Sequence, residues 1–352
     1  MFNFYKNKKI LITGHTGFKG SWLCRILVLA GARVTGYALP PSDNPNLFEL
    51  SEISKDINSI FADIRDLETL KQTVLSAKPE IIIHMAAQPL VRDSYKNPVY
   101  TYETNVMGTV NILEAVRECK TVKSFLNVTT DKVYKNIECE HGYKETDELN
   151  GQDPYSNSKS CSELVTESYK KSFFENASAA ISTARSGNVI GGGDFSQDRI
   201  IPDCIRAIQN KQTLILRNPG SIRPYQHVIE ALFGYLIIIK KQFEDKQYEG
   251  NYNIGPEISD CIKTANLTDL FFSNFENMKW ESKNNNEPHE ACFLKLDNSK
   301  MKKTFNWKPQ IDIKKAVEMT AEWTKAYLNN ENFNGIMNRQ IKEYSELIKK
   351  RI

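Results

Sequence analysis

Short β-branched runs alternate with amphipathic stretches of helical length through the first half of the chain. The expected strands are 9–13, 33–38, 59–62, 80–86, 124–129 and 179–185, and the expected helices are 21–29, 66–77, 99–118 and 155–174. Strands that alternate with helices in this way predict βαβ units and a parallel sheet. The three isoleucines at 81–83 fit a strand that is covered on both faces. The expected fold class is therefore α/β, with a doubly wound parallel sheet of the Rossmann type.

This rhythm changes after residue 185, where glycine-rich and proline-rich loops occur at 191–193 and 218–220. The expected elements are helices at 200–210, 228–243, 262–274 and 313–328, short strands at 214–216, 251–254 and 292–296, and a polar helix in 332–352. The pattern predicts a sheet domain over 1–185, joined by 225–250. A smaller mixed α/β domain over 186–352 is interleaved with it.

Composition narrows the class of protein. The 352 residues are 40% hydrophobic and 25% charged, which is typical of a globular chain and argues against disorder. The net charge of +3 is too small to favour a nucleic-acid partner. Seven cysteines without a CxxC pair and five scattered histidines favour a reducing compartment and no metal site. No apolar signal segment opens the chain, and the longest apolar stretch is too short for a membrane span. The expectation is a soluble cytoplasmic protein.

Three glycines follow the first expected strand and open the first helix. Gly14, Gly17 and Gly20 allow a tight turn and close approach to a pyrophosphate, which the free N–H groups of the helix start then bind. The order Lys19-Gly20-Ser21 reverses that of a P-loop, so a nucleotide triphosphatase is not favoured. The alternative is a glycine-rich βα turn without a ligand.

The end of the second expected strand indicates which dinucleotide fits. The acidic residue that usually binds the adenosine ribose is missing there, since the first carboxylate is Asp43 in the following loop. No arginine follows the strand to bind a 2′-phosphate either. NAD is therefore favoured over NADP.

Tyr155 and Lys159 stand at the start of the helix that follows Pro154. Their i, i+4 spacing places both on one helix face, where an ammonium group lowers the pKa of a nearby phenol. Tyr155 is thus a candidate base that removes a hydroxyl proton while hydride leaves the same carbon. The alternative is a pair on the surface of a helix.

Polar residues also end the strand expected at 124–129. Thr130, Asp131 and Lys132 follow it, at the edge of the sheet where ligand chemistry gathers in open α/β folds. The hydroxyl can bind a reacting oxygen, Asp131 can exchange a proton, and a desolvated Lys132 can act as a base. The alternative is a turn capped by an aspartate.

Together these motifs resemble the extended short-chain dehydrogenase/reductase superfamily. The matching residues are Gly14-x-x-Gly17-x-x-Gly20, Asp63-Ile64, Ala86-Ala87-Gln88, Asn105, Tyr155-x-x-x-Lys159 and Arg185-x-x-Asn188. Residues 14–23, 129–134, 191–194 and 223–228 are similar to those of nucleotide-sugar 4,6-dehydratases, most of all those that act on CDP-glucose. The likeness extends to about Tyr327. It departs at Tyr225, where these dehydratases usually carry tryptophan.

The resemblance implies a lyase that dehydrates CDP-glucose, or a similar sugar nucleotide, to the 4-keto-6-deoxy sugar during deoxysugar biosynthesis for O-antigen or another surface polysaccharide. NAD+ would take hydride from C4 and return it to C6. Tyr155 would take the 4-hydroxyl proton while Thr130 orients the oxygen. Asp131 would protonate the leaving 6-hydroxyl, and Lys132 is the candidate base at C5.

The resemblance also implies binding residues for both ligands. The cofactor set is Gly14, Thr16, Gly17, Phe18, Lys19, Gly20, Asp63, Ile64, Ala86, Ala87, Gln88, Thr104, Asn105, Tyr155 and Lys159. The substrate set is Gln88, Thr130, Asn188, Arg217 and Arg223. Domain 1–185 would then bind NAD and domain 186–352 the sugar nucleotide. His227 is expected to be an interior residue. The helices at 99–118 and 155–174 would form the interface of a homodimer or higher homo-oligomer.

Other functions remain open at this stage. Another nucleotide-sugar 4,6-dehydratase would carry the same motifs. A 4-epimerase on the same fold needs no acid and base beyond Tyr155, so Asp131 and Lys132 argue against it. A non-catalytic cofactor-binding regulator would not need Tyr155, Lys159 and Thr130.

Overall fold

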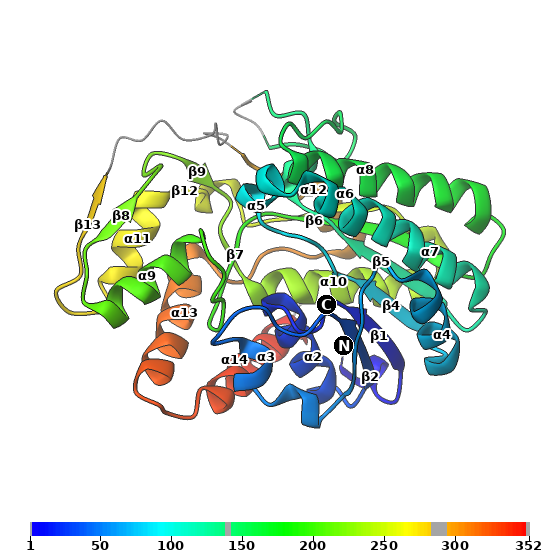
Figure 1. The fold of residues 1–352 in the computed structure, drawn as a ribbon, viewed down its shortest axis with the longest axis horizontal. Helices are drawn as coiled ribbons and strands as arrows, with labels where there is room; N and C mark the ends of the chain where they lie inside the picture. The colour runs from blue at the N-terminus through cyan, green and yellow to red at the C-terminus, as the bar shows by residue number, and fades with distance from the viewer. Residues whose placement is uncertain (1, 138–141, 283–293, 350–352) are drawn as a thin grey trace.

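A seven-stranded parallel sheet forms the centre of the computed structural model, which describes residues 2–137, 142–282 and 294–349 (Figure 1). In spatial order the strands are β11 (Asn251–Ile254), β6 (Ala180–Ser186), β5 (Ser124–Val128), β4 (Ile81–His84), β1 (Lys9–Thr13), β2 (Arg33–Ala38) and β3 (Asn58–Phe61). Every neighbouring pair is parallel. The order reverses beside β1, as in doubly wound folds. The predicted fold class is confirmed.

Helices cover both faces of the sheet because successive strand residues point to opposite sides. Leu11 and Ile82 belong to a core with α4 (Leu67–Ala77), α7 (Gly108–Glu118) and α8 (Pro154–Tyr169). Their neighbours Ile10 and Ile83 belong to a second core with α2 (Phe18–Leu29) and α10 (Val228–Glu244). The first core therefore forms from residues before 182, whereas the second needs segments from both halves of the chain.

Short helices complete the sheet side of the molecule. They are α1 (Phe2–Tyr5), α3 (Leu47–Leu50), α5 (Val91–Lys96), α6 (Pro98–Tyr102) and α12 (Ser299–Phe305). The helix predicted at 99–118 is α6, a π-helical turn (Glu103–Met107) and α7 in succession. Residues 155–174 likewise form most of α8 followed by a π-helical turn (Lys170–Phe174).

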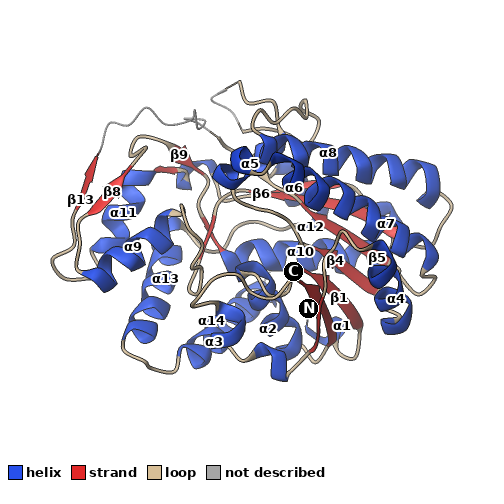
Figure 2. Cartoon of the chain, in the orientation of Figure 1, coloured by secondary structure: helices blue, strands red, loops and turns tan. Residues whose placement is uncertain are grey.

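A smaller lobe lies beyond the carboxyl ends of the strands, at the left of Figure 2. It contains the pairs β7 (Val189–Ile190) with β10 (Gln226–His227), β9 (Ile222–Arg223) with β12 (Ile262–Lys263), and β8 (Leu214–Leu216) with β13 (Trp280–Ser282). Its helices are α9 (Ile200–Asn210), α11 (Thr264–Phe272) and α13 (Ile313–Leu328). The bounds of α9, β8 and α13 are those predicted.

Two expectations for the second half were wrong in part. Residues 251–254 were assigned to the smaller domain, but β11 pairs with β6 and forms the edge of the main sheet. Residues 262–274 divide into β12 and α11 rather than forming one helix. Of the strand expected at 292–296, residues 292–293 lie outside the described residues, and Leu296 makes one isolated bridge with Tyr143. The domain boundaries themselves stay a prediction.

The C-terminal helix α14 (Phe333–Lys349) is not merely polar, because one face is buried and packs on α2. A buried carboxylate on α10 anchors it. Glu230 accepts hydrogen bonds from the Tyr344 hydroxyl and from the backbone N–H groups of Gln310 (3.0 Å) and Ile311 (2.8 Å). Burial raises the pKa of Glu230 to about 7.

This pKa predicts a pH-dependent stability. The unfolded chain releases the Glu230 proton near pH 4.5, whereas the fold retains it to about pH 7. Ionisation therefore opposes folding, and the contribution of Glu230 to stability falls as pH rises through that window. In Glu230→Gln, which cannot ionise, the melting temperature relative to wild type should rise between pH 4.5 and 7. Calorimetry at several pH values measures this, with the exposed ion-pair variant Glu322→Gln as control. A difference that does not change with pH contradicts the prediction.

Candidate active site

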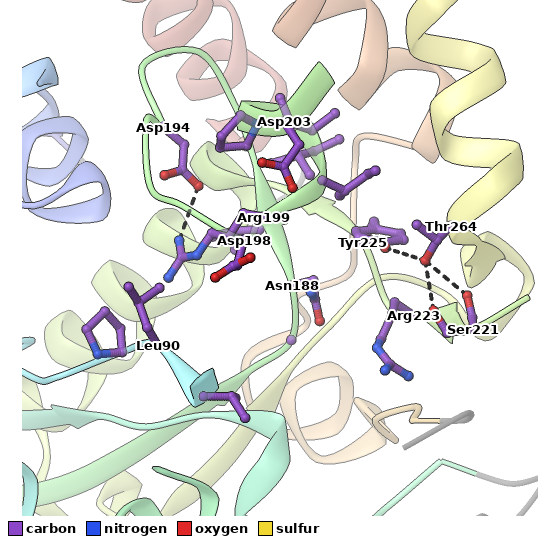
Figure 3. Close-up of a pocket in the computed structure, with 18 of the residues that line it drawn as sticks. Leu90, Asn188, Asp194, Asp198, Arg199, Asp203, Ser221, Arg223, Tyr225 and Thr264 are labelled. Atoms are coloured by element: carbon purple, nitrogen blue, oxygen red, sulfur yellow. Dashed lines mark hydrogen bonds and ion pairs between the residues drawn. The ribbon is translucent and has the colours of Figure 1, made fainter. Parts of the chain in front are cut away.

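A cavity of about 590 Å³ opens at the carboxyl ends of β5 and β6, between the sheet and the smaller lobe. Among the predicted site residues it is lined by Lys19, Thr130, Asp131, Lys132, Tyr155, Asn188, Arg217 and Arg223. Figure 3 shows part of its wall, with Leu90 from the loop before α5 and residues from the segment after β6 and from the smaller lobe. The structure thus brings together residues that are up to 204 positions apart in the sequence, from Lys19 to Arg223.

The turn after β5 holds a buried carboxyl group. Thr130 donates a hydrogen bond to Asp131 Oδ1 (3.0 Å), and its Oγ1 accepts one from the backbone N–H of Lys132 (3.4 Å). Asp131 Oδ2 is buried and has no hydrogen-bond partner among the described residues. Burial raises the pKa of Asp131, although Lys132 and Arg223 act in the opposite direction. The group is suited to hold a proton and to donate it.

Tyr155 is fixed at the N-terminus of α8. Asp153 caps the helix by accepting a hydrogen bond from the Ser156 N–H (2.9 Å), and the Tyr155 N–H donates to Ser94 Oγ (3.1 Å). The prediction that a lysine brings the phenol toward neutrality is wrong in this structure. Burial raises the pKa of Tyr155 to about 12, and Thr130 lowers it only in part.

Lys159 lies beneath Tyr155 on the same helix. It is buried, and its amine donates a hydrogen bond to the carbonyl oxygen of Val128 (3.3 Å). Burial lowers the pKa of Lys159 to about 8. A lysine that titrates so close to neutral pH can exchange protons with its surroundings as well as supply charge.

Lys19 reaches farther than the sequence indicated. It was predicted to bind the cofactor, but its amine points into the cavity and donates hydrogen bonds to Ser186 Oγ (3.1 Å) and the Tyr235 hydroxyl (3.3 Å). Burial lowers its pKa to about 8, with a further contribution from Arg199. Lys19 thus stands between the glycine turn and the reaction residues. Its role toward a cofactor stays a prediction.

The glycine turn has the shape of a dinucleotide cradle. Gly14 has φ +77°, and a Cβ there would lie 2.8 Å from the Ala86 nitrogen. A Cβ on Gly20 would lie 2.2 Å from the Gly14 carbonyl oxygen. A Cβ on Gly17, by contrast, meets nothing nearer than that oxygen at 3.5 Å, and Gly17 is exposed. The fold itself requires glycine at 14 and 20, while Gly17 leaves free the space in front of the N-terminus of α2, where a pyrophosphate fits.

The adenine side of the cradle contains a fixed carboxylate. Asp63 is bound by Arg65, with an Nη2–Oδ2 distance of 2.8 Å, and these hydrogen bonds lower the pKa of Asp63. Ile64 is buried beneath Gly108, and Thr16 donates a hydrogen bond to the Leu39 carbonyl (2.9 Å). Phe18, Ala86 and Ala87 are partly exposed. The set fits a dinucleotide, and each assignment stays a prediction.

Asn105 and Gln88 use their amides within the protein. Asn105 accepts a hydrogen bond from the Gln88 N–H (2.8 Å) and donates one to Ser158 Oγ (2.9 Å). The Gln88 amide donates to Thr101 Oγ1 (3.0 Å). Both side chains therefore fix the loop after β4, and Gln88 is not among the residues that line the cavity. Thr104, in the same region, has a buried hydroxyl without a hydrogen-bond partner among the described residues.

Beneath the reaction residues lies a buried ion pair. Glu163 on α8 and Arg185 on β6 are joined at 2.8 Å, and both side chains are 1% exposed. Glu163 also accepts hydrogen bonds from the hydroxyls of Thr129 and Thr183. Glu163 therefore connects the helix that carries Tyr155 to β6 through Arg185, and to the end of β5 that leads into Thr130 through Thr129.

His227 is buried, as expected of an interior residue. Its Nδ1 accepts a hydrogen bond from the Ile229 N–H (3.3 Å) and caps α10. Its Nε2 has no hydrogen-bond partner among the described residues. Burial lowers the pKa of His227 to about 3, so the ring is neutral and suited to capping rather than to acid catalysis.

Sequence reasoning missed several charged residues of the cavity wall. They are Arg92, Lys96, Asp194, Asp198, Arg199 and Asp203. The available signal was the glycine triplet at 191–193, which marks a loop between a strand and the helix that begins at Ile200. Arg92 had no signal, because nothing in the sequence places α5 opposite that loop.

Tyr225, at the position where the resemblance implies tryptophan, uses its hydroxyl in a polar contact. Its hydroxyl lies 2.9 Å from Thr264 Oγ1, which in turn lies 2.9 Å from Ser221 Oγ (Figure 3). Tryptophan has no hydroxyl for this position. The three residues close one end of the cavity with a polar cluster.

Comparison with known proteins identifies the family. The family described as GDP-mannose 4,6 dehydratase matches residues 11–320, which is most of the chain. The chain belongs to this family of nucleotide-sugar dehydratases. The CDP-glucose 4,6-dehydratase of Salmonella typhimurium is 42% identical to it over 349 residues, 97% of each chain. None of the helices within the described residues has the length and apolarity needed to cross a membrane.

Solved structures share the fold of this family member. One is the dTDP-glucose 4,6-dehydratase of Bacillus anthracis in complex with NAD, with a TM-score of 0.76 and 20% identity over 93% of this chain and 98% of that one. Another is a UDP-glucose-4-epimerase of Stenotrophomonas maltophila with bound NAD, with a TM-score of 0.80 and 18% identity over 92% and 100%. At these identities the likeness concerns the fold alone.

The cradle predicts opposite effects of two matched substitutions. Gly17→Ala should leave the melting temperature near that of wild type, because its methyl group has room within the protein. It should weaken NAD binding roughly tenfold or more, since the methyl group occupies the space of the pyrophosphate. Gly20→Ala should instead lower the melting temperature by roughly 5 °C or more, because its Cβ overlaps the backbone of the turn. Calorimetric titration with NAD and thermal melts measure both. Unchanged NAD affinity in Gly17→Ala would place the cofactor elsewhere.

Proposed function

We propose that this protein is a CDP-glucose 4,6-dehydratase that uses NAD. The observation that carries the proposal is Asp131, a buried carboxyl group with a raised pKa, in one cavity with Thr130, Lys132 and Tyr155. An epimerase has no use for such an acid, whereas removal of a hydroxyl group as water requires one. The near full-length identity to the Salmonella enzyme supports CDP-glucose as substrate.

The first half-reaction is oxidation of the sugar at C4. When bound, NAD+ supplies the acceptor for the C4 hydride and later the donor to C6. Tyr155 takes the 4-hydroxyl proton, and Thr130 orients that oxygen. Because the pKa of Tyr155 is about 12 in this structure, the phenol must be made more acidic in the loaded site. Any positive charge brought beside it acts in this direction.

The second half-reaction is the loss of water across C5 and C6. A 4-ketone makes the C5 proton acidic, and Lys132 removes it. Asp131 gives its proton to the 6-oxygen, so the C6–O bond breaks and water leaves. A bound NAD would supply the hydride that adds to C6, and a proton would add to C5. Burial raises the pKa of Asp131, which favours the protonated form that this step needs.

The remaining cavity residues suit the nucleotide diphosphate. Arg223 is buried in the wall, and its guanidinium matches phosphate oxygens. Asn188, which follows β6, adds an amide. Arg217, just after β8, adds a second guanidinium. These assignments follow the family resemblance and the position of the side chains.

A homodimer is part of the proposal. Large apolar side chains are exposed on α5, α6, the π-helical turn after α6, and α8: Tyr95 (50%), Val99 (70%), Met107 (50%) and Leu164 (56%). Val99, Met107 and Leu164 lie within the two helices, 99–118 and 155–174, that were expected to form the subunit interface, and Tyr95 lies on the preceding helix α5. A second copy of the chain would cover them.

The proposed activity predicts a specific product. Purified protein incubated with NAD and CDP-glucose should give a compound lighter by one water, without net NADH formation, since the hydride returns to the sugar. Mass spectrometry of reactions with CDP-, UDP-, GDP- and dTDP-glucose measures this. Turnover of another sugar nucleotide, with CDP-glucose left unchanged, would overturn the assignment of CDP-glucose as the substrate. A product of unchanged mass would indicate an epimerase.

The separate roles of Asp131 and Lys132 predict that variants of either residue stop after oxidation at C4 and before the loss of water. Oxidation at C4 needs neither Asp131 nor Lys132, whereas elimination needs both. Asp131→Asn and Lys132→Met should each form NADH in a single turnover and hold it, with dehydration slowed roughly 10²-fold or more. Absorbance at the NADH band in stopped flow measures the stall, with Tyr155→Phe as the control that should form little NADH.

Exchange at C5 separates the two roles. In heavy water Lys132→Met should lose deuterium uptake at C5, while Asp131→Asn should keep at least part of it. Normal uptake in the lysine variant would assign the base to another group. Absence of NADH in both variants would mean that the pair only positions the sugar.

A further inference from the structure

Two arginines from opposite walls of the cavity meet at one carboxylate. Asp198, in the loop before α9, forms an ion pair with Arg217, just after β8, and lies 3.7 Å from Arg92 Nη1 on α5. Arg217 also lies 3.6 Å from Asp203. All four residues line the cavity, and Figure 3 shows Asp198 and Asp203 among its wall residues. The contact therefore joins the sheet side of the cavity to the smaller lobe.

The contact is accessible from the cavity. The side chains of Arg92, Asp198 and Arg217 are 39%, 40% and 28% exposed. Ion pairs as exposed as these contribute little to stability. An anion that enters the cavity can therefore displace Asp198 at small cost to the fold.

The position of Asp198 favours such an exchange. It belongs to no helix or strand, and its backbone has φ +60°, a conformation that residues other than glycine adopt uncommonly. Asp194, at the other end of the same loop, is bound separately by Arg199 at 3.2 Å. Asp198 can thus leave its two arginines while Asp194 and Arg199 hold the rest of the loop.

A phosphate group can take the place of the Asp198 carboxylate at Arg92 and Arg217. Guanidinium groups bind carboxylate and phosphate with the same paired geometry, and a diphosphate brings more negative charge and more acceptor oxygens than one carboxylate. Lys19, Arg199 and Arg223 line the same cavity and add positive charge. An incoming diphosphate is therefore attracted more strongly than the carboxylate that it replaces.

We propose that Arg92 and Arg217 form a subsite for the diphosphate of a nucleoside diphosphate, and that Asp198 occupies this subsite until the nucleotide displaces it. The proposal rests on the proposed function, since it assigns further residues to the same substrate. It adds Arg92 to the residues that bind the substrate. It also makes Asp198 an internal competitor, which binds the same two arginines as the diphosphate. Binding of the nucleotide then includes the release of Asp198 from both arginines.

The internal competitor makes an unusual prediction. Removal of the Asp198 charge should tighten nucleotide binding. The diphosphate then no longer has to displace a carboxylate from Arg92 and Arg217 before it binds them. Calorimetric titration at low salt with CDP, UDP and CMP should show that Asp198→Asn binds CDP roughly 3- to 10-fold more tightly than wild type. Arg92→Gln should bind CDP roughly 5-fold or more weakly. For CMP, which has one phosphate, both effects should be smaller.

Controls separate the subsite from simple support of the fold. Glu322→Gln removes an exposed ion pair with Arg339, neither residue of which lines the cavity, and should bind CDP as wild type does. Melting temperatures of all variants should agree within a few degrees, since the pairs are exposed. In Asp198→Asn/Arg92→Gln the effects of the single substitutions should not add, because both act on one contact.

Several results would overturn the proposal. Weaker or unchanged CDP binding in Asp198→Asn would mean that Asp198 positions Arg217 rather than competing at it. Unchanged binding in Arg92→Gln would remove Arg92 from the subsite, as would absence of CDP and UDP binding in wild type. Failure of the proposed function looks different. In that case the binding responses occur as described, but CDP-glucose is not dehydrated.

Discussion

The buried ion pair between Glu163 and Arg185 is the constraint on which the reaction site depends. Isolated buried charges are costly, and further hydrogen bonds to the two partners offset part of the cost of burying a pair. Here Glu163 accepts hydrogen bonds from the hydroxyls of Thr129 and Thr183, and Arg185 donates one to the Tyr134 hydroxyl (2.9 Å). The pair therefore joins β5, β6 and α8 at one depth. Tyr155, Lys159 and Thr130 are positioned from these three elements, so their mutual geometry is set before any ligand binds.

Burial also determines the acid–base character of the cavity. It raises the pKa of Asp131 and lowers the pKa of Lys19 and Lys159 to about 8. One physical cause thus moves an acid and two amines toward neutral pH from opposite directions. A reaction that needs proton donors and acceptors at the same pH profits from such convergence. Tyr155 is the exception, since the same burial moves its pKa away from neutrality.

The sequence predicted what depends on local pattern. The bounds of β1, β2, α9 and α13 follow from periodicity, and the glycine turn follows from its place between strand and helix. The predicted set Thr130, Asp131, Lys132 and Tyr155 lines one cavity because strand ends of a parallel sheet meet at one edge. These inferences needed no knowledge of distant contacts.

Features that depend on tertiary contacts could not be predicted from the sequence. A four-residue strand such as β11 does not encode its partner. Residues 251–254 were therefore assigned to the smaller domain, whereas the strand pairs with β6 in the main sheet. The direction of the Lys19 side chain depends on Ser186 and Tyr235, which are more than 160 residues away. The sign of the pKa shift of Tyr155 depends on how burial compares with nearby charges, and neither can be read from spacing.

The late position of β11 and α14 in the chain has a consequence for biosynthesis. During synthesis from the N-terminus, β6 remains an unpaired sheet edge until residues 251–254 have left the ribosome. The second core waits longer, because α14 packs on α2 from the other end of the sequence. The nascent chain therefore exposes a strand edge and an apolar helix face while the smaller lobe is being made, which is the state in which chains aggregate. For this fold, the sheet edge closes at β11 well before the second core is complete, because that core also needs the buried face of α14.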